Sequence, residues 1–254
     1  MITTAPERLA YGGYLDLPRL LGGPATARTP AHDEALFIAV HRVNELWFEQ
    51  LLYDLSDARD RMLLGETRIP AQRLRRCLAV QRMLQEATAL LDSMTPGEFA
   101  AFRGALGTAS GAQSAQFHEL ELLAARTDPG RVARFGWLTD AERARLARRL
   151  AEPTLWEGFL GVLDLSGLDV SDAAARQRAL AGLPGDTVRT DVLDLAEALR
   201  DYEHAWALWR FRHALVAERQ IGAQPGTAGS AGVSYLRARA DDRLFPELAH
   251  LTVR

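Results

Sequence analysis

The chain has 254 residues, of which 48% are hydrophobic, and its formal net charge is −3. This length and composition are sufficient to bury a core, which excludes a disordered protein, and the negative charge argues against a nucleic-acid-binding protein. The single cysteine, Cys77, excludes an internal disulfide and any C-x-x-C zinc or redox motif. Cysteine usage of this kind is typical of the reducing cytoplasm.

The N-terminal sequence lacks the basic segment followed by an apolar segment that forms a secretion signal. No uncharged apolar run approaches the roughly 18 residues that a membrane-spanning helix needs. We therefore expect a cytoplasmic protein that is not inserted in a membrane.

Residues 1–30 differ in composition from the rest of the chain. They contain "YGGY", "GGP" and three further prolines, so they are expected to form an irregular arm that requires a partner to order it. From residue 31 onward, segments rich in Ala, Leu, Arg and Glu follow helical periodicity, and strand signals are almost absent. The sequence predicts an all-α protein with an arm over 1–30 and a single helical domain over 31–254.

The predicted helices follow one another in chain order. The first two cover about 33–62 and 70–93, and helical spacing resumes near 113 after a loop of small residues. Thr139 and Glu142 form a predicted capping box, and shorter helices are expected between Pro153 and "GLPGD". The longest helix covers about 191–220 and ends before Gly222. At on the order of 45 Å it exceeds what a small bundle core needs, so part of it is expected to serve an interface.

The glycine-rich segment "GAQPGTAGSAGVSYLRAR" follows and is predicted to be a loop. It is not a phosphate loop, because it lacks the G-K-[ST] ending and a preceding strand.

Two histidines of the longest predicted helix point in opposite directions. His204 and His213 are nine residues apart, so they lie about 180° apart around the helix and cannot bind the same ion. Trp206, Trp209 and His213 instead share one face. This combination suits a flat apolar cofactor such as haem, whose iron is often held by one helix histidine. The alternative is a core histidine with a satisfied N–H.

His41 has the same two interpretations. Phe37, His41, Glu45 and Phe48 form one stripe of the first predicted helix, a pattern that core packing also produces. No H-E-x-x-H motif and no set of two histidines and one carboxylate is recognisable from spacing. From these residues alone the prediction is an all-α domain that binds a cofactor or has histidines in its core.

Four segments in order resemble the tryptophan 2,3-dioxygenase family: "YGGYLDLPRLL", "HDEALFIAVHRVNELWFEQ", "FRGALGTASGAQSAQF" and "WRFRHALVAERQIGAQPGTAGSAGVSYLR". The resemblance implies a helical haem-binding enzyme that assembles as a homotetramer and acts on L-tryptophan and dioxygen. It implies haem b with ferrous iron in the active state. Because C-x-x-C-H is absent, the haem is expected to be non-covalent.

The resemblance also implies site residues. His213 matches the proximal haem ligand, His41 matches the histidine that accepts the indole N–H, and Phe37 matches the apolar wall beside the indole. A neutral imidazole supplies the acceptor that an indole N–H requires.

Residues outside these two helices complete the implied site. Arg103 matches the arginine that pairs with the substrate carboxylate, a role that suits a guanidinium fork. Thr227 matches a threonine of a closing loop that holds the ammonium and carboxylate, and Ser110 matches a serine near the haem edge. Tyr11 and Tyr14 match tyrosines of an arm that reaches a neighbouring subunit's site.

The chain departs from the family pattern at several positions. It has Ala112 where a phenylalanine is usual, His118 where an arginine is common, Arg42 where a glutamine often follows the histidine, and "GTAGSAG" in the closing loop. The expected reaction is oxygen insertion at the indole C2–C3 bond, giving N-formylkynurenine. The alternatives are a monooxygenase that converts tryptophan or a methylated tryptophan to a 2-oxindole or 3-hydroxylated product, a non-catalytic haem sensor or carrier, and a helical scaffold without haem.

Overall fold

The computed structural model describes residues 10–21, 28–125 and 129–251. All regular elements within these ranges are helical, and no strand occurs among them. The predicted all-α fold is confirmed.

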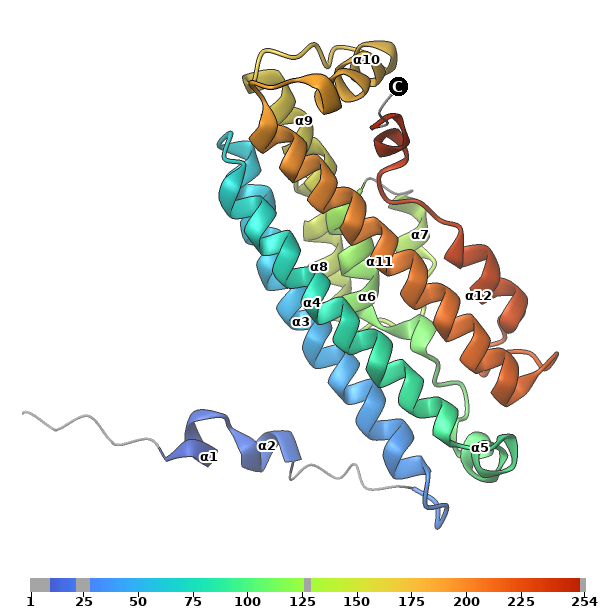
Figure 1. Cartoon of the computed structure of the whole chain (residues 1–254). Helices are drawn as coiled ribbons and strands as arrows, with labels where there is room; N and C mark the ends of the chain where they lie inside the picture. The colour runs from blue at the N-terminus through green and yellow to red at the C-terminus, as the bar shows by residue number, and fades with distance from the viewer. Residues whose placement is uncertain (1–9, 22–27, 126–128, 252–254) are drawn as a thin grey trace, which may run out of the picture.

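Three long helices form the centre of the molecule and lie side by side (Figure 1). They are α3 (Glu34–Leu63), α4 (Arg68–Leu90) and α11 (Thr190–Ile221). Apolar side chains at helical spacing meet between them and are removed from water, for example Leu51, Leu74 and Leu199, each with no exposed surface. The predicted helices 33–62, 70–93 and 191–220 correspond closely to these elements.

Shorter helices cover this centre. α6 and α9 pack on α3, α8 packs on α6, and α12 packs on α11. The bounds of the shorter α-helices are α5 Pro96–Arg103, α6 Ala115–Ala124, α7 Pro129–Ala133, α8 Asp140–Ala151, α9 Leu155–Leu165, α10 Ala173–Gly182 and α12 Val233–Ala240. The 3-10 helices are η1 Leu91–Ser93, η2 Gly104–Leu106, η3 Gly111–Gln113, η4 Leu183–Gly185 and η5 Pro246–His250.

Local capping signals decide where several helices begin and end. The predicted capping box of Thr139 with Glu142 is present at the start of α8. The same arrangement begins α9 at Thr154 and α5 at Thr95, where the sequence "MTPGEF" both breaks the preceding helix and starts the next. α11 ends as predicted, at Gly222, whose φ of 54° is strained for residues with a side chain.

Two expectations for irregular segments were wrong in part. The segment 222–239 is not a loop throughout, because its last residues form α12 against α11. The arm contains two short helices, α1 (Tyr11–Tyr14) and α2 (Leu17–Leu21), drawn apart from the bundle in Figure 1. Residues 1–9 and 22–27 of the arm lie outside the described ranges. The division into an arm and one domain stays a prediction.

None of the described helices combines the length and the apolar composition that crossing a membrane requires.

We predict that the centre of the bundle depends on the large side chain of Phe159, which α9 buries completely. Phe159→Ala should lower the free energy of unfolding by about 3–5 kcal/mol, because the lost apolar contacts leave a cavity. Leu165→Ala on the same helix, where the side chain is 67% exposed, should change it by less than about 0.5 kcal/mol. Urea unfolding of both variants tests this, and equal losses would contradict it.

Candidate active site

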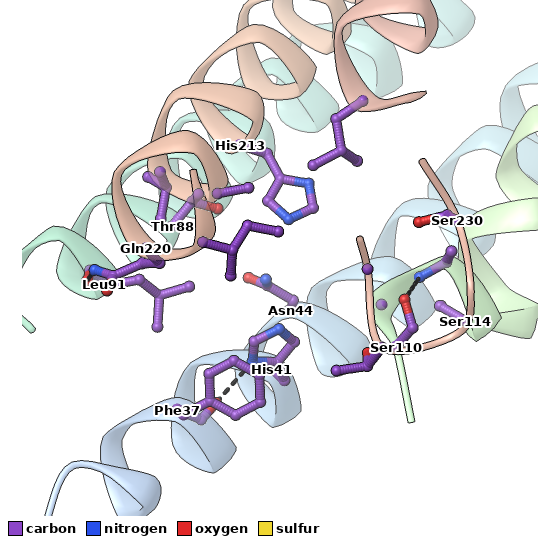
Figure 2. Close-up of a pocket in the computed structure, with 18 of the residues that line it drawn as sticks. Phe37, His41, Asn44, Thr88, Leu91, Ser110, Ser114, His213, Gln220 and Ser230 are labelled. Atoms are coloured by element: carbon purple, nitrogen blue, oxygen red, sulfur yellow. Dashed lines mark hydrogen bonds between the residues drawn. The ribbon is translucent and has the colours of Figure 1, made fainter. Parts of the chain in front are cut away.

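A cavity of about 250 Å³ lies between α3, α4 and α11, and the segments 103–118 and 226–239 complete its wall. Six of the eight predicted site residues line it: Phe37, His41, Arg103, Ser110, Thr227 and His213. Tyr11 and Tyr14 do not, and their side chains are 77% and 76% exposed. Figure 2 shows His41 on α3 and His213 on α11 at the same cavity.

His41 is held in a defined tautomer. Its Nδ1 lies 2.7 Å from the backbone oxygen of Phe37, and because a carbonyl only accepts, Nδ1–H is the donor (Figure 2). Burial lowers the pKa of His41, so the ring is neutral near pH 7. A neutral ring protonated at Nδ1 leaves Nε2 as a hydrogen-bond acceptor.

His213 is also a neutral imidazole. Burial lowers its pKa to about 4, and the nearby His41 acts in the same direction. Its ring lies 5.5 Å from that of Trp209, measured between centroids, and faces the cavity. His204, in contrast, is exposed on the opposite side of α11, as the helical spacing predicted. A neutral nitrogen beside an aromatic wall is able to ligate a metal.

Aromatic rings form much of the cavity wall around His41. Phe37 lies 4.1 Å from the His41 ring and 5.5 Å from the ring of Phe102, measured between centroids. Glu45 and Phe48 also reach the cavity, so the whole predicted stripe of α3 lines it. The expectation for Trp206 was wrong: it belongs to the main core with Phe48, and Trp209 is the tryptophan of α11 that reaches the cavity.

Three hydrogen bonds join the segment 222–232 to the rest of the cavity wall. The Arg103 guanidinium donates to the backbone oxygen of Pro225 at 2.6 Å and to the side chain of Gln224. The Thr227 hydroxyl donates to the backbone oxygen of Ala109 at 2.5 Å. Each contact joins segments that are more than 100 residues apart in the chain, which sequence spacing does not reveal.

A buried charged group on another part of the wall was missed in the sequence. Arg210 is 6% exposed, donates to Glu121 at 2.9 Å and to the backbone oxygen of Asp242 at 3.0 Å. Arg239 also pairs with Glu121, and burial lowers the pKa of Arg210. Arg210 precedes His213 by three residues, so helical spacing alone indicates that the two side chains lie on the same face of α11.

Two buried amides of the wall were missed as well. Gln220 donates from Nε2 to the backbone oxygens of Leu91 and Met94 at 3.1 and 3.0 Å. Asn44 is 9% exposed, and its Oδ1 has no hydrogen-bond partner. Asn44 follows His41 by three residues on α3, and its position on the same helix face was readable from the sequence.

Two of the departures from the family pattern contact each other. The Nε2 of His118 lies 2.9 Å from the backbone oxygen of Ala112, and the His118 ring stacks on Phe135 at 4.3 Å between centroids. Both His118 and Ala112 line the cavity. Arg42 is exposed and does not line it.

No group of three or more His, Cys, Asp or Glu side chains within the described ranges is arranged to hold a metal ion. A metal at His213 would therefore need most of its ligands from a cofactor. An apolar cavity with one neutral imidazole and flat aromatic walls fits an iron porphyrin, and the second imidazole with Arg103 fits an amphipathic aromatic ligand.

Comparisons with known proteins agree with this geometry. The family profile of tryptophan 2,3-dioxygenase matches residues 3–141 and 178–253. The tryptophan 2,3-dioxygenase of Nocardioides sp. is 44% identical over 247 residues, which cover 95% of this chain and 92% of that protein. Those of Herpetosiphon aurantiacus and Anaeromyxobacter sp. are 35% and 36% identical, with at least 94% of each chain covered. Profile, relatives and site geometry together show that the chain belongs to the tryptophan 2,3-dioxygenase family, which is haem-dependent.

Proposed function

We propose that the protein is a haem-dependent oxygenase that inserts both atoms of dioxygen at the C2–C3 bond of L-tryptophan and forms N-formylkynurenine. The observation that carries this proposal is the meeting of two neutral imidazoles, His41 and His213, in one cavity with the Arg103 guanidinium in its wall. Family membership supports the same reaction.

Non-covalent haem b would be held by His213, whose ring lies next to that of Trp209. Ser110 also lines the cavity, and we assign it to the haem edge. Arg210 and Arg239 also line the cavity, where both pair with Glu121. When bound, ferrous haem supplies the centre that takes up dioxygen and makes it reactive toward the indole.

The indole of tryptophan has one N–H donor and otherwise needs an apolar surface. His41 offers the acceptor Nε2, and Phe37 packs directly against the His41 ring. His41 thereby orients the indole and holds its N–H, while the aromatic wall excludes water.

The amino-acid part of the substrate carries both charges. Arg103 would bind the carboxylate as a fork, and Thr227 would bind the ammonium or carboxylate from the segment 222–232. In the structure Arg103 donates to Gln224 and Pro225, and Thr227 to Ala109. Substrate binding therefore exchanges these contacts, which couples recognition of the zwitterion to the conformation of the closing segment.

We further propose a cytoplasmic homotetramer in which the arm completes the cavity of a neighbouring subunit. Support comes from Tyr11 and Tyr14, which are largely exposed, and from α1, which contains no buried residue.

We predict that His213 and His204 differ in haem binding. His213→Ala should lose most of the haem, because the cavity has no second imidazole on α11, whereas His204→Ala should retain it. The Soret absorbance per protein after haem supplementation measures this. Equal haem content in both variants would remove His213 as the ligand, and a parent protein without a Soret band would remove the haem proposal.

We predict that Arg103→Leu weakens L-tryptophan binding by about 2–5 kcal/mol, the cost of truncating one partner of a buried charge pair. Arg237→Leu is the control, because this arginine is 56% exposed and pairs with Glu218 on the surface. Tryptamine, which lacks the carboxylate, should bind the parent protein poorly in the same titration. Similar affinities for tryptamine and L-tryptophan would show that Arg103 is not the carboxylate partner.

We predict that deletion of residues 1–17 reduces turnover and leaves haem binding intact. In the proposed tetramer Tyr11 and Tyr14 complete the substrate site of a neighbouring subunit, whereas the haem is held by His213. Haem content and turnover are measured on the same preparation. Full turnover after deletion would contradict the shared-site proposal.

We predict that both atoms of isotopically labelled dioxygen enter the product. A reaction that incorporates both atoms consumes no external electrons, so turnover should not consume added reductant stoichiometrically. Product mass with reductant titrated measures both quantities. One labelled atom and a one-to-one demand for a two-electron reductant would instead indicate the monooxygenase that forms a 2-oxindole or 3-hydroxylated product.

A further inference from the structure

The inner part of the cavity contains one polar side chain that has no role so far. Asn44 is nine-tenths buried, lines the cavity and follows His41 by three residues on α3. Figure 2 shows its carboxamide in the region between the rings of His41 and His213. Within the described ranges its side chain makes no hydrogen bond.

The donor groups of the polar side chains of Thr88, Gln220 and His41 nearby are already engaged. The Thr88 hydroxyl donates to the backbone oxygen of Leu84 at 2.9 Å and accepts from the indole of Trp209 at 3.0 Å. The amide nitrogen of Gln220 is held by two backbone oxygens, and Nδ1 of His41 is held by Phe37. The oxygen of Gln220 has no partner either, so of the two carboxamides that line the cavity among the described residues, Asn44 is the one whose N–H group is not hydrogen-bonded.

A buried carboxamide without a partner destabilises the folded protein, because it has lost its hydrogen bonds to water. An apolar residue of similar shape would avoid this cost and is ordinarily favoured in such a position. The carboxamide is consequently explained best by a ligand that it contacts.

The proposed reaction leaves one ligand that lacks a protein partner. The tryptophan carboxylate and ammonium are assigned to Arg103 and Thr227, and the indole N–H to His41. Dioxygen remains, and it is an acceptor that an amide N–H is able to bind. The N–H group of Asn44 makes no competing hydrogen bond within the described ranges, so it is free to donate to such a ligand.

We propose that Asn44 donates a hydrogen bond to the diatomic ligand taken up by the haem, between His213 and the indole, and so sets its orientation and residence time. This inference rests on the proposed function and adds a residue to it. A donor three residues from His41 on the same helix would hold indole and dioxygen in a fixed relation, since both contacts move with α3.

Carbon monoxide is a suitable probe, because it binds ferrous haem at the position of dioxygen and is not turned over. A hydrogen bond to its oxygen draws electron density into the antibonding orbital and lowers the C–O stretching frequency. Asn44→Leu removes the donor with little change of shape, and Asn44→Ala removes both the donor and the volume. Gln81→Leu is the matched control, because Gln81 is a fully buried amide of α4 with an unpartnered oxygen that does not line the cavity.

In haem-loaded protein, both Asn44 variants should raise the C–O stretching frequency relative to the parent and to Gln81→Leu. Dioxygen should dissociate roughly two- to tenfold faster from the Asn44 variants, the factor that corresponds to one hydrogen bond. In haem-free protein, Asn44→Leu should melt at the same or a higher temperature than the parent, which separates a ligand-directed residue from one that supports the fold.

The proposal is overturned if haem-loaded Asn44 variants keep the parent's C–O frequency and dioxygen dissociation rate. It is also overturned if only the affinity for L-tryptophan falls, because Asn44 would then contact the substrate. In both cases the proposed oxygenase function stands. A parent protein that binds no haem removes that function and this inference together.

Discussion

The site depends on keeping two imidazoles uncharged inside an apolar cavity. Burial opposes the protonated form of both His41 and His213, and the nearby His41 also disfavours a positive charge on His213. A neutral His213 has a free nitrogen lone pair for a metal, and a neutral His41 has one for an N–H donor. The packing of α3, α4 and α11 maintains this state, because it excludes water from the cavity wall.

The three long helices supply rigidity, whereas the closing segments supply selectivity. His41 and His213 lie on α3 and α11, and each of these helices has buried residues along most of its length. Arg103 and Thr227 instead lie where the segments 103–118 and 222–232 meet, and each donates to a backbone oxygen of the other segment. Under the proposed function a zwitterionic ligand would compete for these donors, so its recognition would be coupled to the contacts of the segment 222–232.

The part of the cavity wall around Glu121 is held by buried ion pairs rather than by apolar packing. Arg210 and Arg239 share this carboxylate in a buried setting, where an unpaired guanidinium would be costly. His118 lies beside this group, with its ring against Phe135 and its Nε2 at the backbone of Ala112. The departures at 112 and 118 therefore act as one local change in the wall rather than as two separate ones.

Much of the fold was determined by sequence patterns of short range. Helical periodicity predicted α3, α4 and α11, the capping box at Thr139 predicted the start of α8, and Gly222 predicted the end of α11. These signals were sufficient because capping and periodicity depend on residues within one or two turns. The helix α12 was missed because "GVSYLRARA" has a weak pattern and is stabilised by packing on α11.

The features of the site also fall into those that helix spacing predicts and those that only the packing of the helices decides. Helix geometry alone separated His213 from His204 and aligned Phe37 with His41, because angular position depends only on spacing. Spacing did not reveal that α3 and α11 bring their histidines to one cavity, nor that Trp206 turns into the core while Trp209 reaches the wall. It also did not reveal the unpartnered amide of Asn44 or the contacts of Arg103 and Thr227. Those features join residues far apart in the chain, and only the packing of the helices decides which of them meet and which polar atoms remain without a partner.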